Sequence, residues 1–367
     1  INGPGIYVLN VNNYNNSYLR DTDEFDDDVL MHEYGHFLVE RYGIDNTPGG
    51  CHTLTDNNLD LRLAWSEGLG TFFPIAIKQW LRSNYPGRMS MLVTEPNSLY
   101  VDTQYISGTG NSPIISFDFD SPESNTFSEP LDPEAFEFAS SEVAVLKILL
   151  EITRTYGMNP IWDVVQNYFP DATYPTSLAS FWDGAVSEGI MAPDVLQQFF
   201  NERKVYYKAD SFESDDDIST ATHVTINAPA VVDHYLYRST GGSDVDVFAI
   251  DLKQNVNYQI ATGELRNGID TRIRLLDEFG EPVMVNGVAL ENDDAIPNNY
   301  SRYDPFCFGG QSRTFVDKTS LASTIQFKPA TTGRYYVEVE HIEKFSFDDN
   351  FTGHYGSYHL NVIEING

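Results

Sequence analysis

The first half of the chain carries apolar residues at helical spacing. Leu30, Tyr34, Phe37, Leu38 and Tyr42 fall on one face of a helix, so we expect a helix there. Three aspartates precede this segment, where the N-terminus of a helix favours negative charge. Further helical patterns are expected over residues 63 to 73, 133 to 156, 160 to 169, 177 to 188 and 193 to 207.

After residue 208 the pattern changes to alternating apolar and polar positions between Gly- and Asn-rich turns. Strands are expected at residues 231 to 237, 245 to 252, 257 to 262, 272 to 277, 324 to 328, 335 to 340 and 357 to 363. Short strands of this kind predict an all-β sandwich, jelly-roll-like in type. We therefore predict an α+β chain with a mainly helical domain at residues 1–208, an acidic linker near residue 211 and a β-sandwich at residues 212–366.

Two segments of the first domain lack a helical pattern. Residues 5 to 11 contain a short apolar run and predict one strand, followed by a polar loop. Residues 84 to 133 are rich in Pro, Ser, Asn and Gly, so we expect irregular chain that wraps a cleft.

The first predicted helix contains the motif H-E-x-x-H. At positions i and i+4 the imidazoles of His32 and His36 project from one face, one turn apart, which is the spacing that holds one zinc ion. Glu33 lies between them and is placed to take a proton from a water molecule whose pKa the metal lowers. Two surface histidines and a glutamate without a metal are the alternative interpretation of the motif.

Catalytic zinc needs a third protein ligand, and Glu67 is the candidate. It is the one carboxylate in the apolar stretch of residues 63 to 73, where an unpaired charge is costly to bury. Gly68 and Gly70 beside it would let two helices approach closely. Together the two segments resemble the gluzincin metallopeptidases, which combine H-E-x-x-H with a glutamate on a following helix. The resemblance implies a zincin-like catalytic domain in which His32, His36 and Glu67 bind zinc.

This resemblance also implies Glu33 as general base. Four positions after the glutamate ligand, the thermolysin-like branch often has an aspartate that orients a histidine ligand. This chain has Thr71 there, so we expect a different set of groups behind the ligands. Gluzincins generally have a small β-sheet before the zinc helix, and the residues before the motif can supply only its last strand. Either a propeptide has been removed before Ile1, which we favour, or the catalytic domain is a reduced form.

Composition narrows the class of protein. The formal net charge of the 367 residues is −32, which argues against nucleic acid and anionic membranes as partners. No run of eighteen apolar residues exists, so no membrane-spanning segment is expected. Such an acidic surface suits a soluble, secreted extracellular protein.

Several other residues are candidates for contacts with substrate or with the zinc ligands. His52 lies in a turn-rich loop before Glu67 and is either a surface imidazole or part of the cleft. Glu142 is the one charge on an apolar helical stripe, so it either faces the cleft, as a partner of a ligand or of a substrate amine, or lies at the wet end of the stripe. The oxyanion that forms in peptide hydrolysis also needs a stabilising group. The candidates for it are Tyr100, Tyr105, Tyr156, Tyr168 and Tyr174, unless His52 serves.

The second domain contains several short sequence motifs in a fixed order, among them Glu213-Ser214-Asp215-Asp216, Asp244-Val245-Asp246 and Glu291-Asn292-Asp293-Asp294. They resemble the bacterial pre-peptidase C-terminal domain, which follows many secreted peptidases and is similar to collagen-binding modules. The resemblance implies a separable module that binds an extracellular matrix protein or other polymer, and often calcium. Hard oxygen ligands for calcium are available from Asp215, Asp216, Asp244, Asp246, Asn292 and Asp293, whose alternative is ordinary turn and linker residues.

Cys51 and Cys307 leave three possibilities open. They form a disulfide between the domains, they are two buried free thiols, or one thiol lies near the zinc. For the whole chain we predict a secreted zinc metalloendopeptidase acting on a protein or peptide. An aminopeptidase with the same zinc set and an inactive binding or adhesion protein are the alternatives.

Overall fold

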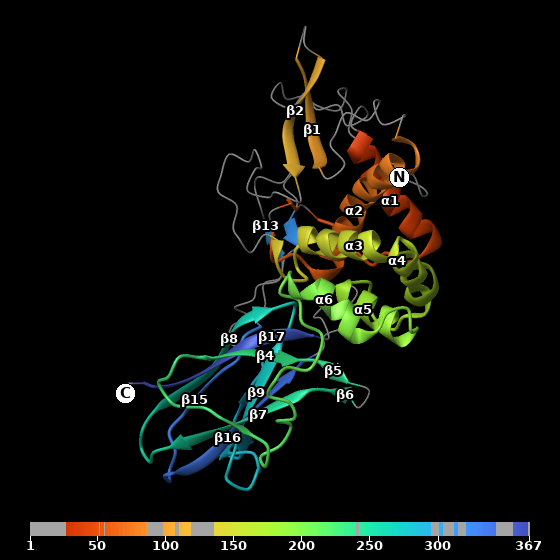
Figure 1. Cartoon of the computed structure of the whole chain (residues 1–367). Coiled ribbons are helices and arrows are strands. Elements are labelled where there is room, and N and C mark those ends of the chain that lie inside the picture. The colour runs from red at the N-terminus through yellow and green to blue at the C-terminus, as the bar shows by residue number, and fades with distance from the viewer. Residues whose placement is uncertain are drawn as a thin grey trace.

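A computed structural model gives the arrangement of the chain. It describes residues 27–50, 52–54, 56–86, 98–106, 110–118, 136–239, 242–294, 301–303, 312–314, 321–342 and 355–365. Helices occupy the first part of the described chain and strands occupy most of the rest, which confirms the α+β class (Figure 1). We call residues 27–86 and 136–207 the helical region and residues 222–365 the β region. The expected strand at residues 5 to 11 lies outside the described residues.

The two helices predicted around the zinc motif are both present. Helix α1 covers Asp27–Tyr42 and begins with acidic residues in its first turn. Helix α2 covers Leu61–Asn84, and its N-cap Asp60 accepts a hydrogen bond from the backbone N–H of Arg62. That cap satisfies one of the N–H groups left without a partner at a helix start.

Glycines set the spacing between the helices, as expected for Gly68 and Gly70. A Cβ on Gly35 of α1 would lie 3.1 Å from the Cβ of Phe73 and 3.6 Å from the Cα of Gly70 on α2. A Cβ on Gly68 would lie 2.7 Å from the Cβ of Val145 on the third helix. Helix α2 therefore packs closely on both neighbours, and side chains at these positions would push the helices apart.

A buried ion pair also joins α1 to α2. The Nζ of Lys78 lies 2.8 and 2.9 Å from the two carboxylate oxygens of Asp28, and both side chains are almost fully buried. Burial lowers the pKa of Lys78, while the charge of Asp28 opposes the shift. Asp28 lies one turn before His32, so this pair fixes α1 on α2 close to the zinc motif.

The remaining helices complete the helical region. They are α3 Glu142–Tyr156, α4 Asn159–Asp163, a π-helical turn Val164–Tyr168, a 3₁₀ turn Phe169–Asp171, α5 Leu178–Ser187 and α6 Pro193–Asn201. Their apolar faces form one core around Trp65, Phe181 and Phe200. The helix expected from residue 133 begins only at residue 142, because Ser141 caps it and Phe138 has a φ of 70°.

The segment expected to be irregular contains a hairpin. Strands β1 (Ser98–Ile106) and β2 (Gly110–Asp118) pair in antiparallel fashion, and β1 packs beside α1 and α2 (Figure 1). The expectation of irregular chain over residues 84 to 133 was therefore wrong for these two stretches.

The β region contains two larger sheets. The longer strands are β4 Val231–Leu236, β7 Val245–Leu252, β8 Tyr258–Arg266, β9 Thr271–Leu276, β15 Thr324–Phe327, β16 Gly333–His341 and β17 Gly356–Glu364. The short ones are β3 Thr222–His223, β5 Arg238–Ser239, β6 Gly242–Ser243, β10 Met284–Val285, β11 Val288–Ala289, β12 Glu291–Asn292, β13 Ser301–Tyr303 and β14 Ser312–Thr314. One sheet has the order β12-β9-β16-β7-β3 and the other the order β15-β8-β17-β4.

Alternation along these strands builds a second core. Ile273 and Val337 from the first sheet meet Ile260 and Tyr358 from the second in one buried cluster. The pairing is antiparallel throughout both sheets except for β3, which runs parallel to β7. All seven expected strands are present, with ends shifted by a few residues. Among the described residues, no helix is long and apolar enough to cross a membrane.

Candidate metal centre

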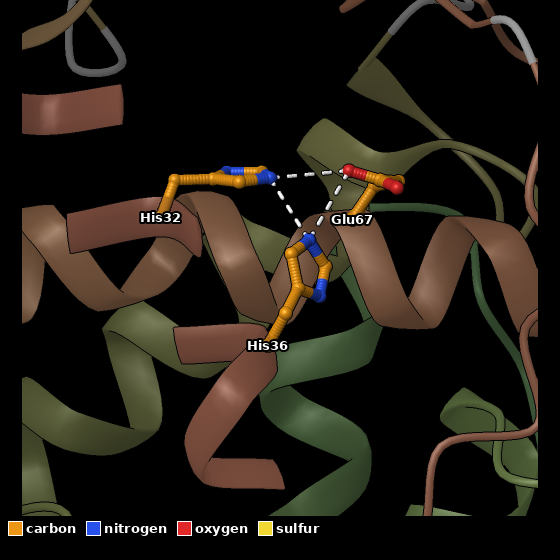
Figure 2. Close-up of side chains that lie close together, drawn as sticks. All are labelled: His32, His36 and Glu67. Carbon is orange, nitrogen blue, oxygen red and sulfur yellow. Dashed lines mark hydrogen bonds and ion pairs between the residues drawn. The ribbon is translucent and has the colours of Figure 1, made fainter. Parts of the chain in front are cut away.

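Three side chains converge where α1 meets α2. His32 and His36 project from α1 and Glu67 from α2, and all three point at one another (Figure 2). The Nε2 atoms of the two histidines are 3.0 Å apart. One carboxylate oxygen of Glu67, Oε2, lies 3.2 Å from Nε2 of His32 and 3.5 Å from Nε2 of His36.

These distances fit one metal ion. A tetrahedral zinc ion with bonds of about 2.1 Å separates neighbouring ligand atoms by about 3.4 Å. The three measured separations are 3.0, 3.2 and 3.5 Å, so the donor atoms already lie near the corners of such a tetrahedron. Two imidazoles and a carboxylate are also a donor set that zinc takes in catalytic sites. The residues present therefore fit a zinc ion with a fourth position left open.

Each histidine has a partner on its other ring nitrogen. Nδ1 of His32 lies 3.2 Å from the hydroxyl of Thr71, one turn after Glu67 on α2. Nδ1 of His36 lies 3.4 Å from the hydroxyl of Ser66, which donates a 2.6 Å hydrogen bond to Asp45. Nδ1–H groups that donate to these hydroxyls leave both Nε2 atoms free to bind a metal.

We expected groups other than the usual aspartate to hold the histidines, and the structure shows hydroxyl groups in that position. Thr71 bonds His32 at the position where an aspartate was missing, and the charged partner, Asp45, serves His36 through Ser66. Sequence reasoning did not identify Asp45 or Ser66. Asp45 lies in a turn-rich loop, and nothing in the sequence indicates which histidine it faces.

The triad is electrostatically coupled. Burial raises the pKa of Glu67, but hydrogen bonds from the surrounding imidazoles outweigh it, and the pKa lies well below its usual value. Burial lowers the pKa of His36, yet the hydrogen bond and charge of Glu67 raise it overall. Glu67 is therefore an ionised, buried carboxylate, as a zinc ligand must be.

His52 and Glu142 both reach this site. Nε2 of His52 lies 3.2 Å from Oε2 of Glu67 and 3.6 Å from Oε2 of Glu142. Burial lowers the pKa of His52, but Glu67 and Glu142 raise it to about 10. Burial raises the pKa of Glu142 to about 7 although His52 opposes this. Glu142 is 2% exposed, which rules out the wet end of the stripe and leaves little surface for a substrate amine.

Glu33 lies between the two histidines on α1 and is half-buried, and its charge acts on His36. The candidate tyrosines are dispersed. Tyr156 lies at the far end of α3 from Glu142, half-exposed, and packs against Phe199. Its described contact is therefore away from the triad.

The other four candidate tyrosines lie in other parts of the chain. The ring of Tyr168 lies where a Cβ on Gly184 would touch it, and Tyr174 faces Arg238. Tyr100 and Tyr105 lie in β1, the strand beside α1 and α2, and their side chains are outside what the structure describes.

Comparison with known proteins adds two partial likenesses. No protein-family model matches the sequence, and a search of curated proteins finds no match. Among solved structures, the pre-peptidase C-terminal domain of a collagenase from Bacillus anthracis matches 39% of this chain and 93% of its own, with 19% identity and a TM-score of 0.21. CorA, a surface-associated copper-binding protein of Methylomicrobium album BG8, matches 39% of this chain and 96% of its own, with 14% identity and a TM-score of 0.23. TM-scores this low establish neither a fold nor a function for this chain.

A second group of possible metal ligands lies where the chain enters the β region. Carboxylate oxygens of Glu213, Asp216 and Asp244 lie within 4.8 Å of one another, and Asp215, His234 and Asp246 form a similar, fully buried group. Four of the six predicted calcium ligands therefore lie in these groups, Asp216 and Asp244 in the first and Asp215 and Asp246 in the second. The structure adds Glu213, which belongs to the same acidic motif, and His234, which no sequence signal indicated.

Burial and the neighbouring negative charges raise the pKa values of these carboxyl groups. Burial, with the charge of Asp244, raises the pKa of Glu213 to about 8. Burial also raises the pKa of Asp244 and of Asp215 to about 6. A bound cation would relieve this repulsion, because it offers the charge that the neighbouring side chains lack.

Asn292 and Asp293, the other two predicted calcium ligands, belong to neither group. Asn292 lies on β12, at the edge of the five-stranded sheet, and two strands separate it from β7, which Asp244 precedes. Its side-chain oxygen already accepts a 2.7 Å hydrogen bond from the N–H of Thr324. The proposed pairing of Cys51 with Cys307 concerns residues outside the described part of the chain.

Proposed function

We propose that this chain is a zinc metalloendopeptidase. The observation that carries the proposal is the mutual spacing of the donor atoms of His32, His36 and Glu67, which fits one tetrahedral ion. Glu33, on the same helix, supplies the additional carboxylate that peptide hydrolysis needs next to such an ion.

A zinc ion held by this triad supplies Lewis acidity, which lowers the pKa of a water ligand and polarises a peptide carbonyl. The protein does the rest. Glu33 takes a proton from the attacking water and returns it to the leaving amine. Thr71 and Ser66 hold the two imidazoles in the tautomer that presents Nε2 to the metal. His52, beside Glu67, or one of the candidate tyrosines stabilises the oxyanion.

The β region has a supporting role in this proposal. Its sequence motifs favour a jelly-roll-like sandwich of the pre-peptidase C-terminal type, exported with the peptidase to an extracellular setting. The group Glu213, Asp216 and Asp244 offers oxygen atoms alone and suits Ca²⁺. The partner of the whole chain is a protein or peptide substrate, with an extracellular matrix protein or other polymer held by the β region.

The test is digestion of a peptide library by the purified chain with and without a chelator. Glu33→Gln should keep one zinc per chain and lower hydrolysis at least about a hundredfold. Glu40→Gln is the matched control, because Glu40 is an exposed glutamate on the same helix. Near-normal turnover in Glu33→Gln would contradict the mechanism. Removal of N-terminal residues alone from the peptides would indicate an aminopeptidase. A parent chain that neither binds zinc nor cleaves peptides would indicate a binding protein.

A further inference from the structure

A short buried segment connects the β region to the candidate metal centre. Residues 138–141, which we call the strap, lead into α3 and its first residue, Glu142. All four are buried, and Phe138 adopts a φ of 70°, an uncommon conformation for a bulky residue. Such a conformation persists only where its surroundings hold it.

The helical region holds one side of the strap. The N–H of Phe138 donates to the carbonyl of Arg203 at 2.7 Å. The carbonyl of Ser140 accepts from the N–H of Leu59 at 3.0 Å, and its hydroxyl donates to the carbonyl of Asn57 at 2.7 Å. The strap is thereby tied to the segment that precedes α2.

The turn between β8 and β9 holds the other side. The side-chain oxygen of Asn267 accepts a 2.8 Å hydrogen bond from the N–H of Ala139, and its amide nitrogen donates to the carbonyl of Lys204 at 3.3 Å. The guanidinium of Arg266 lies over the ring of Phe138, 4.8 Å from its centroid. At Gly268, an added Cβ would lie 2.5 Å from a methyl carbon of Leu61, the first residue of α2.

The far end of the strap reaches the zinc ligands. Glu142 follows it directly, and its carboxylate lies 3.6 Å from His52, which lies 3.2 Å from Glu67. The backbone oxygen of Glu142 also lies where a Cβ on Gly68 would be only 2.7 Å away. A shift of the strap would therefore move groups on two sides of Glu67.

We propose that Asn267 is a positioning residue for the zinc site, because it holds the strap and, through the strap, keeps Glu142 and His52 against Glu67. The inference rests on the proposed function, since it concerns the same metal. It gives the β region a part in the metal centre, whereas the sequence suggested a separable module. Each group behind a metal ligand contributes about 10- to 100-fold in affinity, so a residue that acts on such groups through the strap is expected to contribute no more than the low end.

The test compares two substitutions in the full chain. Asn267→Gly removes the side-chain hydrogen bonds but tolerates the φ of 60°. Asn227→Gly is the matched control. Asn227 also has a φ of 60°, and its side chain accepts a hydrogen bond from the backbone N–H of Glu364. It lies in the β region, and among the described residues it makes no hydrogen bond to the strap. Zinc affinity is measured by competition with a chelator, and the absorption spectrum of the Co²⁺-loaded chain reports ligand geometry.

Asn267→Gly should bind zinc about tenfold more weakly than the Asn227→Gly chain and should alter the Co²⁺ spectrum. Arg266→Gln is the second variant, because it removes the nearer of two cations over the ring of Phe138, the other being Lys204, and leaves the turn intact. A smaller loss in the same direction is expected. Equal zinc affinity and equal spectra in all variants would overturn the inference while leaving the zinc site in place. A parent chain that binds no zinc would instead overturn the proposed function, and this inference with it.

Discussion

Gly70→Ala is the sharpest perturbation that the metal centre offers. Gly70 lies on α2, one turn after Glu67, against both imidazoles. An added Cβ would lie 2.8 Å from Nε2 of His36 and 3.0 Å from Nε2 of His32, the two atoms that the metal needs. Ordinary contacts begin at 3.4 Å, so the ring of His36 must move by about 0.6 Å to make room.

That movement is large for a metal site. Zinc–ligand distances have a tolerance of roughly 0.2 Å, about a third of the required shift. The rings cannot turn freely, because Ser66 and Thr71 hold their Nδ1 atoms. We therefore expect Gly70→Ala to weaken zinc binding at least about tenfold.

The fold should tolerate the same change. Alanine is favoured over glycine within a helix by about 0.8–1.0 kcal/mol, and overpacking typically costs about 1–3 kcal/mol. The free energy of unfolding of the zinc-free chain should thus fall by no more than about 2 kcal/mol.

The assay is zinc titration against a competing chelator, together with thermal unfolding of the zinc-free chain. Gly184→Ala is the control, because its Cβ would crowd the ring of Tyr168 inside the same helical region, and its nearest neighbours include no residue of the triad. Unchanged zinc affinity in a folded Gly70→Ala chain would refute the placement of the metal between these side chains.

Three further predictions follow from the same structure. Glu67→Ala should abolish tight zinc binding, and a chain of this variant that still holds one zinc with unchanged affinity would place the third ligand elsewhere. Lys78→Met should lower the free energy of unfolding by about 3–5 kcal/mol, because it leaves Asp28 buried without its ammonium partner, whereas a double variant that also replaces Asp28 by Leu should recover most of the loss in chemical denaturation. In the folded chain the pKa of Asp244 is raised to about 6 and that of Glu213 to about 8. When a chelator removes metal ions, the stability that these protonated carboxyl groups contribute is therefore present at low pH and is lost as the pH rises to about 8. Added Ca²⁺ should then raise the melting temperature at pH 8 more than at pH 5, and equal effects at both pH values would contradict a calcium site there.

The triad could be predicted because its decisive feature is local. The spacing of His32 and His36 within one helix fixes their common face, and a carboxylate in the apolar stretch around Glu67 signals a buried partner. The alternation of the long strands likewise placed the β region, since burial on one face imposes a period of two.

Other parts depended on contacts between distant segments. Residues 98–118 looked irregular partly because of Pro113, which a two-stranded sheet tolerates since both strands are edges. The helical pattern before Glu142 continued through the strap, yet tertiary hydrogen bonds hold Phe138 at a positive φ and delay the helix. The pairing of Ser66 with Asp45 requires the loop to fold back, which no local pattern encodes.

The order of strands in the β region has a consequence for how the protein is made. Strand β17 follows β8 along the chain only after β9 to β16, yet it lies between β8 and β4 in the middle of its sheet. A nascent chain emerges from the ribosome N-terminus first, so β8 and its turn are exposed well before β17 can pair with them. Until then the sheet that carries Asn267 has a gap at its centre. On the proposed role of Asn267, the metal centre therefore acquires its final shape only after β17 has paired in this sheet.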